Sequence, residues 1–461
     1  MYPIDWSKVF SRTRSSVPSP AASDTDETNT APGASKSRRW LPVVSRTVWA
    51  LGFTSLLTDI SSEMIASILP VYLVLYLGIS PLAFGVVDGL YEGAAALMRI
   101  GGGVFADRWR KYKIVATLGY FVSACCRLLI FIAGSAWGMI ALIITLDRFG
   151  KGIRTAPRDA LISKRSPISR LATAFGVHRS LDAVGALLGP ILAFVLLALL
   201  PRAFDVLFVA SFGVAILGLG VITLFVPADT PDERDSPTPV APKTAGHLRC
   251  SSCSHGSDCP ATPVSLKTVV NLLGESRFRA LVLTAIVLGL ASISDGFIYL
   301  VLQRRLDVGI AVFPLLYVGT SLFTSLFAIP CGRLADRAGR TRVLLSGYGM
   351  LLLVYVILLL PAAGGLFQIA VVLFLLGAFY AATDGVLTAM TAAALPISHS
   401  GSGLAVLATA SDLSRLVAAM MFGFLWSRVG VHQATAGYLF ALAIAIAAAS
   451  FLLIRSKPHA T

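Results

Sequence analysis

The chain contains a series of long apolar runs, and these constrain its fold more than any other feature of the sequence. A membrane-spanning helix needs about 20 consecutive, predominantly apolar residues, and each run is close to that length or longer. We therefore expect an all-α membrane protein with twelve transmembrane helices in two six-helix bundles. The predicted spans are 47–77, 82–105, 114–132, 137–153, 172–200 and 206–226 in the first bundle, and 280–302, 310–329, 343–360, 366–389, 403–425 and 434–454 in the second.

The amino-acid composition supports a membrane location. Hydrophobic residues make up 56% of the 461 residues and charged residues only 13%, whereas soluble domains are close to half apolar and about a quarter charged. The apolar residues come in continuous runs, while the strands of a transmembrane β-barrel alternate polar and apolar positions. This pattern argues against a transmembrane β-barrel.

The positive charges predict the orientation of the chain. The net charge of +14 does not indicate a nucleic-acid partner, because the Lys and Arg residues lie mainly in the tails and in short turns between apolar runs. Basic residues concentrate on the cytoplasmic side of membrane proteins, so both termini are expected in the cytoplasm (N-in, C-in). The basic residues that then fall outside are Arg202, Arg304, Arg305 and Arg428, and those within spans are Arg99, Arg127, Arg148, Lys151, Arg179 and Arg415.

The spans divide the chain into five regions. Residues 1–45 are rich in Ser, Thr, Pro and Ala and lack an apolar stretch, which predicts a disordered cytoplasmic tail without a signal peptide. Residues 46–226 form the first bundle and 280–455 the second. A cytoplasmic linker, 227–279, separates them, and 456–461 form a short tail. We expect a multi-pass protein of the cell membrane, specifically the bacterial inner membrane.

A repeated loop connects equivalent helices of the two halves. GGVFADRWRKYK follows the second span and GRLADRAGRTR follows the eighth, about half the chain apart. Parallel six-helix repeats that hold a substrate between them are one way of building transporters. The Asp-Arg pair near a helix end can form an ionic latch between the halves; the alternative, a purely topological role, accounts for the basic residues but not for the Gly-to-Asp spacing. The latch residues are Gly103, Asp107 and Arg108 in the first copy and Gly332, Asp336 and Arg337 in the second.

These loops resemble the signature of the major facilitator superfamily. The second copy matches the family at Gly332, Asp336, Arg337, Gly339 and Arg340, while the first departs from it at Arg110. The segment DRFGKGIRTAPRDAL resembles the family's helix-4 motif at Arg148 and Gly152, and its extended form is similar to a poorly characterised prokaryotic subgroup. The resemblance implies a monomeric transporter in which Arg148 is linked to proton coupling.

The fifth span carries a further resemblance. The spacing of Gly176, Gly185, Gly189 and Pro190 is similar to the motif of drug–proton antiporters, which implies export, although Ala193 and its neighbour replace the family's final glycine pair. Gly185 and Gly189 also form a small-residue surface that permits close helix approach. Pro190 can loosen a helix. Gly185, Gly189 and Pro190 therefore form either a moving hinge or a surface for helix packing alone.

Four carboxyl groups lie within the first two spans. Asp59 and Glu63 are four residues apart, as are Asp88 and Glu92, so each pair projects from one helical face. An ionised acid at a helix centre costs about 2.5–3.5 kcal/mol on insertion scales, so these groups must face an aqueous or protein interior. We interpret them as proton or cation sites; internal salt bridges with intramembrane Arg or Lys are the alternative. Asp295 lies in the seventh span near the position equivalent to Asp59.

Three further groups of polar residues are candidates for function. His178 and Asp182 in the fifth span suit proton shuttling or, alternatively, helix-end packing. Asp412 and Arg415 are spaced for a structural pair. The Cys and His residues of the linker segment HLRCSSCSHGSDC suit the binding of a soft or borderline metal ion. The alternative is that they reflect incidental linker composition and bind nothing. Its candidate metal ligands are Cys250, Cys253, Cys259 and His255, with His247 nearby.

The sequence favours a secondary active transporter. It has no Walker-type phosphate loop and no catalytic triad or metalloprotease spacing, so we expect neither enzymatic activity nor a cofactor. The predicted partners are protons, the lipid bilayer and an amphipathic or cationic small molecule, which the protein exports in exchange for protons. The alternatives are a metal-cation exporter, an importer of an organic solute and a non-transporting receptor on the same fold. The coupling or substrate candidates are Asp59, Glu63, Asp88, Glu92, Arg148, His178, Asp182 and Asp295.

Overall fold

A computed structural model describes residues 44–94, 112–167, 171–227, 274–306, 308–361, 365–395 and 400–455. Every regular element in these ranges is helical. The elements of the N-terminal half are α1 (Arg46–Ala66), α2 (Leu69–Val71), the π-helix η2 (Tyr72–Tyr76), a helix over residues 81–94, α4 (Tyr112–Ala133), α5 (Trp137–Lys164), α6 (Leu171–Leu199) and α7 (Phe204–Phe225).

The C-terminal half repeats this all-helical pattern. Its elements are α9 (Ser276–Leu290), α10 (Asp295–Leu306), the 3-10 helix η5 (Ile310–Val312), α11 (Phe313–Ala338), α12 (Arg340–Leu359), α13 (Gly365–Ala394), α14 (Ser400–Val429) and α15 (Val431–Arg455).

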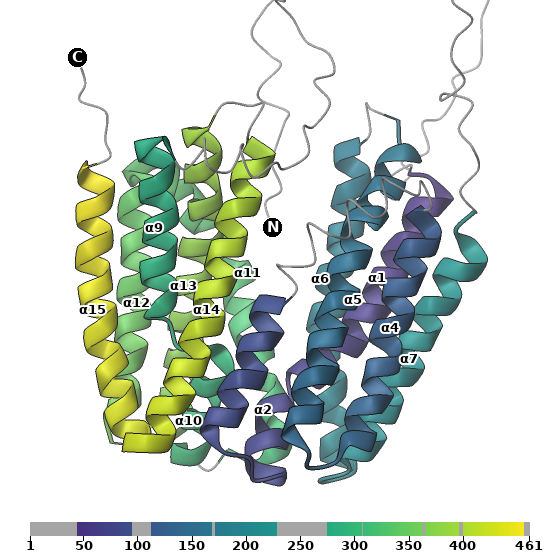
Figure 1. The fold of residues 1–461 in the computed structure, drawn as a ribbon, viewed down its shortest axis with the longest axis horizontal. Coiled ribbons are helices and arrows are strands. Elements are labelled where there is room, and N and C mark those ends of the chain that lie inside the picture. Colours follow the sequence, from purple (N-terminus) through teal and green to yellow (C-terminus); the bar gives the residue numbers. More distant parts are fainter. Residues whose placement is uncertain are drawn as a thin grey trace, which may run out of the picture. The chain divides into compact units, whose positions relative to one another are not determined.

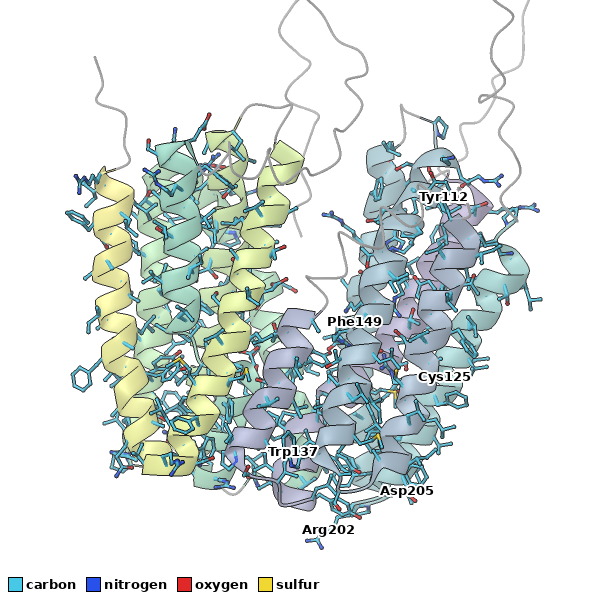
Figure 2. All side chains as sticks on the ribbon, in the orientation of Figure 1. Tyr112, Cys125, Trp137, Phe149, Arg202 and Asp205 are labelled. Carbon is cyan, nitrogen blue, oxygen red and sulfur yellow. The ribbon has the colours of Figure 1, made fainter. Side chains whose placement is uncertain are left out.

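Helices of each half pack mainly against one another. In the N-terminal half α1 packs on α6 and α7, and α4 packs on α5 and α7; in the C-terminal half α13 packs on α11 and α12, and α9 packs on α14 and α15 (Figure 1). Tyr112 lies at one end of α4, whereas Trp137, Arg202 and Asp205 lie at the opposite end of the helices α4–α7 (Figure 2).

Within the described residues, ten helices are long and apolar enough to cross a membrane. Two of the twelve predicted spans are not among them. Residues 95–105 of the second predicted span lie outside the described ranges. The fourth forms α5, but α5 carries Asp147, Arg148, Lys151 and Arg154 within its apolar part and continues to Lys164, beyond the predicted end at Ile153. A helix this charged must have its polar face covered by other helices.

The first span is interrupted near its end. α1 begins with Ser45, whose side chain accepts a hydrogen bond from the Val48 amide at 3.4 Å, and ends at Ala66. Pro70 has no amide hydrogen and cannot continue the ladder of a helix interior. The chain therefore turns at residues 67–68 before α2 and η2 complete the span.

The span that begins the second half is also broken, between α9 and α10. The break, Ala291–Ser294, contains neither Gly nor Pro. Its freed backbone groups are bonded to one side chain of α12: the Tyr355 hydroxyl accepts from the Ile293 amide at 2.6 Å and donates to the Ala291 carbonyl at 3.3 Å. Broken helices are tolerated at membrane depth only where such groups are satisfied inside the protein, so Tyr355 makes this break possible.

Tyr355→Phe is expected to lower the stability of the protein. The substitution leaves a buried amide and a buried carbonyl without their partner, and one such orphaned group costs about 1–3 kcal/mol. Thermal unfolding of the detergent-solubilised chain measures the effect as a lower melting temperature. Tyr348→Phe is the control, because it removes a hydroxyl from the same helix without freeing the backbone of the break. Equal melting temperatures for the two variants would contradict this role of Tyr355.

Candidate functional site

A cavity of about 240 Å³ lies between helices from both halves of the chain. The N-terminal half contributes α1, α2 and helix 81–94, and the C-terminal half contributes the break 292–294, α10, α11, α13 and α14. In transporters built from repeats, the substrate is held between the repeats.

Four of the predicted coupling residues meet at this cavity. Glu63, Asp88, Glu92 and Asp295 all line it, although they come from three helices and two halves of the chain. Asp88 reaches across to α10, where a Cβ atom at Gly296 would lie 3.2 Å from its Oδ1. The other carboxyl oxygen of Asp88 is buried and has no hydrogen-bond partner among the described residues. The prediction that these acids face an interior is consistent with this placement.

The remaining walls of the cavity are aromatic and include one cation. Tyr91, Tyr317, Phe379 and Tyr380 contribute rings, and the Tyr380 hydroxyl donates to Asp295 Oδ1 at 2.7 Å. Arg415 also lines the cavity. Its guanidinium lies 3.6 Å from Asp384 on α13, so the ion pair that the structure gives Arg415 crosses between helices rather than joining Asp412 three residues before it. The cavity thus carries more negative than positive charge and several ring faces.

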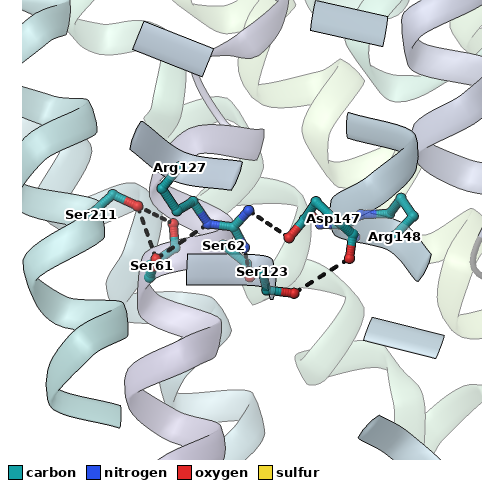
Figure 3. Close-up of polar contacts among 7 residues, drawn as sticks. All are labelled: Ser61, Ser62, Ser123, Arg127, Asp147, Arg148 and Ser211. Carbon is teal, nitrogen blue, oxygen red and sulfur yellow. Dashed lines mark hydrogen bonds and ion pairs between the residues drawn. The ribbon is translucent and has the colours of Figure 1, made fainter. Parts of the chain in front are cut away.

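A buried ion network lies next to this cavity in the N-terminal half. Asp147 of α5 binds Arg127 of α4 through Oδ1 at 2.7 Å and its neighbour Arg148 through Oδ2 at 2.5 Å. The three residues are each at most 4% exposed. Figure 3 shows that Arg127 also donates to Ser61 and to Ser62 of α1, at 3.4 and 2.7 Å. One carboxylate therefore serves as the counter-ion of two guanidinium groups, which leaves a net charge of +1 among the three side chains. Arg127 ties α1 to α4 and α5.

The ion network reaches the cavity through one aromatic ring. The Arg148 guanidinium lies 3.9 Å from the centroid of Tyr91, within the range of a cation–π contact, and Tyr91 lines the cavity. Arg148, which the sequence marks as a coupling residue, therefore does not line the cavity itself. It contacts a residue that does.

A second pair of acids lies away from the cavity, between α1 and α6. Asp182 accepts a hydrogen bond from Ser55, which lies one turn before Asp59 on α1, and a Cβ atom at Gly185, three residues after Asp182, would lie 3.2 Å from Asp59 Cβ. Arg158 of α5 donates to the same Ser55 hydroxyl at 3.3 Å. His178, one turn before Asp182, is 2% exposed, and its Nε2 has no hydrogen-bond partner within the described part of the chain.

The glycines of the predicted hinge are close-packing positions. A Cβ atom at Gly185 would lie 3.1 Å from Leu56 Cα and 3.2 Å from Asp59 Cβ, and one at Gly189 would lie 2.7 Å from Glu63 Cβ. α6 therefore sits directly on the face of α1 that carries both acids, as the small-residue spacing predicts. Pro190 is buried, and α6 continues through it.

The described copy of the predicted latch pairs locally. Asp336 lies 3.3 Å from Arg340, and Arg340 also donates to the Ala389 carbonyl of α13 at 3.3 Å. Gly339 has φ +99°, a conformation that strains other residues. Gly103, Asp107 and Arg108 of the first copy lie outside the described residues, as do the linker candidates Cys250, Cys253, Cys259 and His255. Among the described residues, no group of three or more His, Cys, Asp and Glu is placed to hold a metal ion.

Two parts of this site escape the sequence analysis. Asp147 is hidden by its position beside Arg148, since the pair fits a short motif and gives no sign that Arg127 joins it from another helix. Tyr380 and Tyr91 are ordinary aromatic residues in apolar runs. The one available signal for Asp147 is energetic, because two arginines at membrane depth require a counter-ion.

Comparison with known sequences identifies the family. The family profile described as Major Facilitator Superfamily matches residues 51–317 and 280–461. Over 391 residues the chain is 31% identical to MJ1317 of Methanocaldococcus jannaschii, a protein described as an uncharacterized MFS-type transporter, and the match covers 83% of this chain and 89% of that one. The chain belongs to the Major Facilitator Superfamily. This membership confirms the resemblance of the loop motifs and makes the protein a multi-pass membrane protein of a transporter family.

Solved structures of the superfamily share the fold. The nucleoside transporter NupG has a TM-score of 0.67 at 13% identity, covering 90% of this chain and all of that one. A bacterial homologue of the human lysosomal transporter Spinster, in an inward-facing and unoccupied conformation, has a TM-score of 0.64 at 14% identity over 93% of this chain and all of that one. A second sequence relative matches over a shorter stretch. Mb2288 of Mycobacterium bovis is 35% identical over 159 residues, which are 34% of this chain and 38% of that protein.

Proposed function

We propose that this member of the superfamily is a secondary active exporter that exchanges a small organic cation for protons by alternating access. In this proposal residues 46–226 and 280–455 are two six-helix bundles, both termini are cytoplasmic, and the protein works as a monomer in the bacterial inner membrane. The observation that carries the proposal is the cavity to which both halves contribute carboxyl groups. A static receptor has no need of several acids at membrane depth, each of which is costly to keep there.

The chemistry of the cavity favours a cationic solute. Glu63, Asp88, Glu92 and Asp295 outnumber its single guanidinium, which already has Asp384 as a partner. Ring faces of Tyr91, Tyr317 and Phe379 add cation–π surface. The volume is below the roughly 300–1,000 Å³ of pockets for drug-sized ligands, so the bound form is expected to be small or only partly enclosed.

Close contact between the halves supports alternating access. Helix 81–94, which carries Asp88 and Glu92, crosses α14 at glycines: a Cβ at Gly85 would lie 3.3 Å from Gly423 Cα, and one at Gly423 would lie 3.2 Å from Gly85 Cα. At Gly85 and Gly423 the two backbones meet without a side chain between them, a close approach that small residues permit. We propose that this crossing opens when the cavity is exposed to the other side.

Asp88→Asn and Asp295→Asn are each expected to slow cation-dependent proton movement by about tenfold. A contact to a charged group is worth about 1.5–3 kcal/mol, and 1.4 kcal/mol is a factor of ten. The measurement uses proteoliposomes with an internal pH-sensitive dye, to which ethidium, choline or agmatine is added below saturation.

The matched control is Asp205→Asn, at the first turn of α7 and away from the cavity. Wild-type rates in both cavity variants would remove these acids from the transport site. No proton movement with any cation in the wild-type protein would favour a non-transporting receptor.

A further inference from the structure

We propose that Asp59 and Asp182 form a single proton-binding site at the α1–α6 contact, physically separate from the cavity that holds the solute. The inference rests on the proposed function, because it assigns the proton side of the exchange to a place of its own. The two residues lie in different helices, and neither lines the cavity.

The first argument is that the two acids are neighbours across the helix contact: a Cβ atom at Gly185, three residues after Asp182, would lie 3.2 Å from Asp59 Cβ. Two neighbouring carboxylates at membrane depth repel each other, and this repulsion favours the state in which one of the two groups holds a proton. The hydroxyl of Ser55 donates to Asp182. In this arrangement the pair holds one proton, fixed between two helices.

The second argument is the surrounding charge, which allows the proton to leave. Nearby cations stabilise a pair of carboxylates that has lost its shared proton. Arg158 does so through Ser55, and Lys151 lies close to Asp59. The charged and titratable groups nearest the pair are Lys151, Arg154 and Arg158 from α5 and His178 from α6. Around these lie Glu63 of α1, beside Lys151, and Asp159 and Arg179, beside His178.

His178 offers an exchange partner for the proton. It is one turn from Asp182 on the same helix, 2% exposed, with Nε2 lacking a hydrogen-bond partner among described residues. An imidazole nitrogen can both accept and donate a proton. A buried, unpaired ring nitrogen beside a proton-sharing pair is therefore placed to pass the proton on.

The third argument is the mechanical link between the pair and the cavity. Asp59 and Glu63 are neighbours on one face of α1, but only Glu63 lines the cavity. A Cβ atom at Gly185 would lie 3.2 Å from Asp59 Cβ, and one at Gly189 would lie 2.7 Å from Glu63 Cβ, so each glycine packs directly on one of the two acids. A change of charge at Asp59 therefore acts on Glu63, one helical turn away, by electrostatic repulsion. It also acts on Glu63 through the shared contact with α6.

Infrared difference spectroscopy of the reconstituted full chain tests the site without any solute. In the wild type we expect a protonated-carboxyl band from the pair, in addition to any from the cavity acids, that disappears on alkalinisation and is absent in both Asp59→Asn and Asp182→Asn. Loss in both variants is expected because the shared proton needs both groups. Asp88→Asn and the control Asp205→Asn should keep the band. A band of wild-type size and pH dependence in either pair variant would overturn the shared site.

Accumulation of ethidium driven by an imposed pH gradient separates this inference from the proposed function. Asp59→Asn and Asp182→Asn should lose the accumulation together with the band, whereas Asp88→Asn should lose the accumulation and keep the band. Gradient-driven accumulation at the wild-type level in both pair variants would overturn the coupling role. If the wild-type chain accumulates no ethidium, the proposed transport fails for this cation, and the infrared result still decides the proton site.

Discussion

Asp147→Asn is expected to destabilise the protein by about 3–5 kcal/mol, the cost of removing one partner from a buried ion pair. Asp147 is the shared counter-ion of Arg127 and Arg148, at 2.7 and 2.5 Å, in a network that excludes solvent. An asparagine keeps the shape of the side chain but leaves two buried guanidinium groups without a compensating charge. We expect a sharply lower yield of monodisperse protein and a lower melting temperature in detergent.

The control for this substitution is Asp159→Asn, in the later part of the same helix, α5. Asp159 pairs with Arg158 at 3.0 Å, but its side chain is 43% exposed, and an exposed pair is worth only about 0–1 kcal/mol. A second variant, Asp147→Asn with Arg127→Met, should recover part of the loss because it removes one of the orphaned charges. Equal stability of Asp147→Asn and Asp159→Asn would show that the network does not carry the stability assigned to it.

Gly189→Leu is expected to break the α1–α6 contact and with it much of the N-terminal half. A Cβ atom at this position would lie 2.7 Å from Glu63 Cβ, 2.8 Å from the Ile60 carbonyl oxygen and 3.0 Å from the Met64 nitrogen. Two of these atoms are backbone and cannot rotate away. Overpacking lowers the free energy of unfolding by about 1–3 kcal/mol and occasionally more. We expect a leucine at this backbone contact to cost about 3 kcal/mol, the upper end of that range.

Gly220→Leu on α7 is the matched control, since no atom lies within 4 Å of a Cβ built there. The comparison is made by the melting temperature and by the yield of folded protein after reconstitution. Gly189→Ala should fall between wild type and Gly189→Leu. A Gly189→Leu protein as stable as Gly220→Leu would mean that α6 does not depend on close approach to α1.

Much of the fold follows from sequence because the bilayer restricts the solutions so strongly. The apolar runs predict the helices, and the glycine spacing in α6 predicts a close contact that the structure has at Gly185 and Gly189. The cost of acids at membrane depth also predicts that Asp59, Glu63, Asp88 and Glu92 avoid lipid. These inferences need only local pattern and transfer free energy.

What the sequence does not contain is the choice of partners across helices. Arg415 has an acid three residues before it, yet its ion pair is made with Asp384 of α13. Asp59 and Glu63 look equivalent along α1, but in the packed structure Asp59 lies beside Asp182 of α6, whereas Glu63 lines the cavity. The break at Ala291–Ser294 has no Gly or Pro to announce it, because its support comes from Tyr355 on another helix.

That break has a consequence for how the cavity will respond to mutagenesis. Ser292, Ile293 and Ser294 form part of its wall, and the main chain of this stretch is bonded to the hydroxyl of Tyr355, which does not line the cavity. Replacing side chains one at a time would leave these peptide groups in place. Tyr355→Phe would instead alter the cavity wall, although the Tyr355 side chain does not line the cavity.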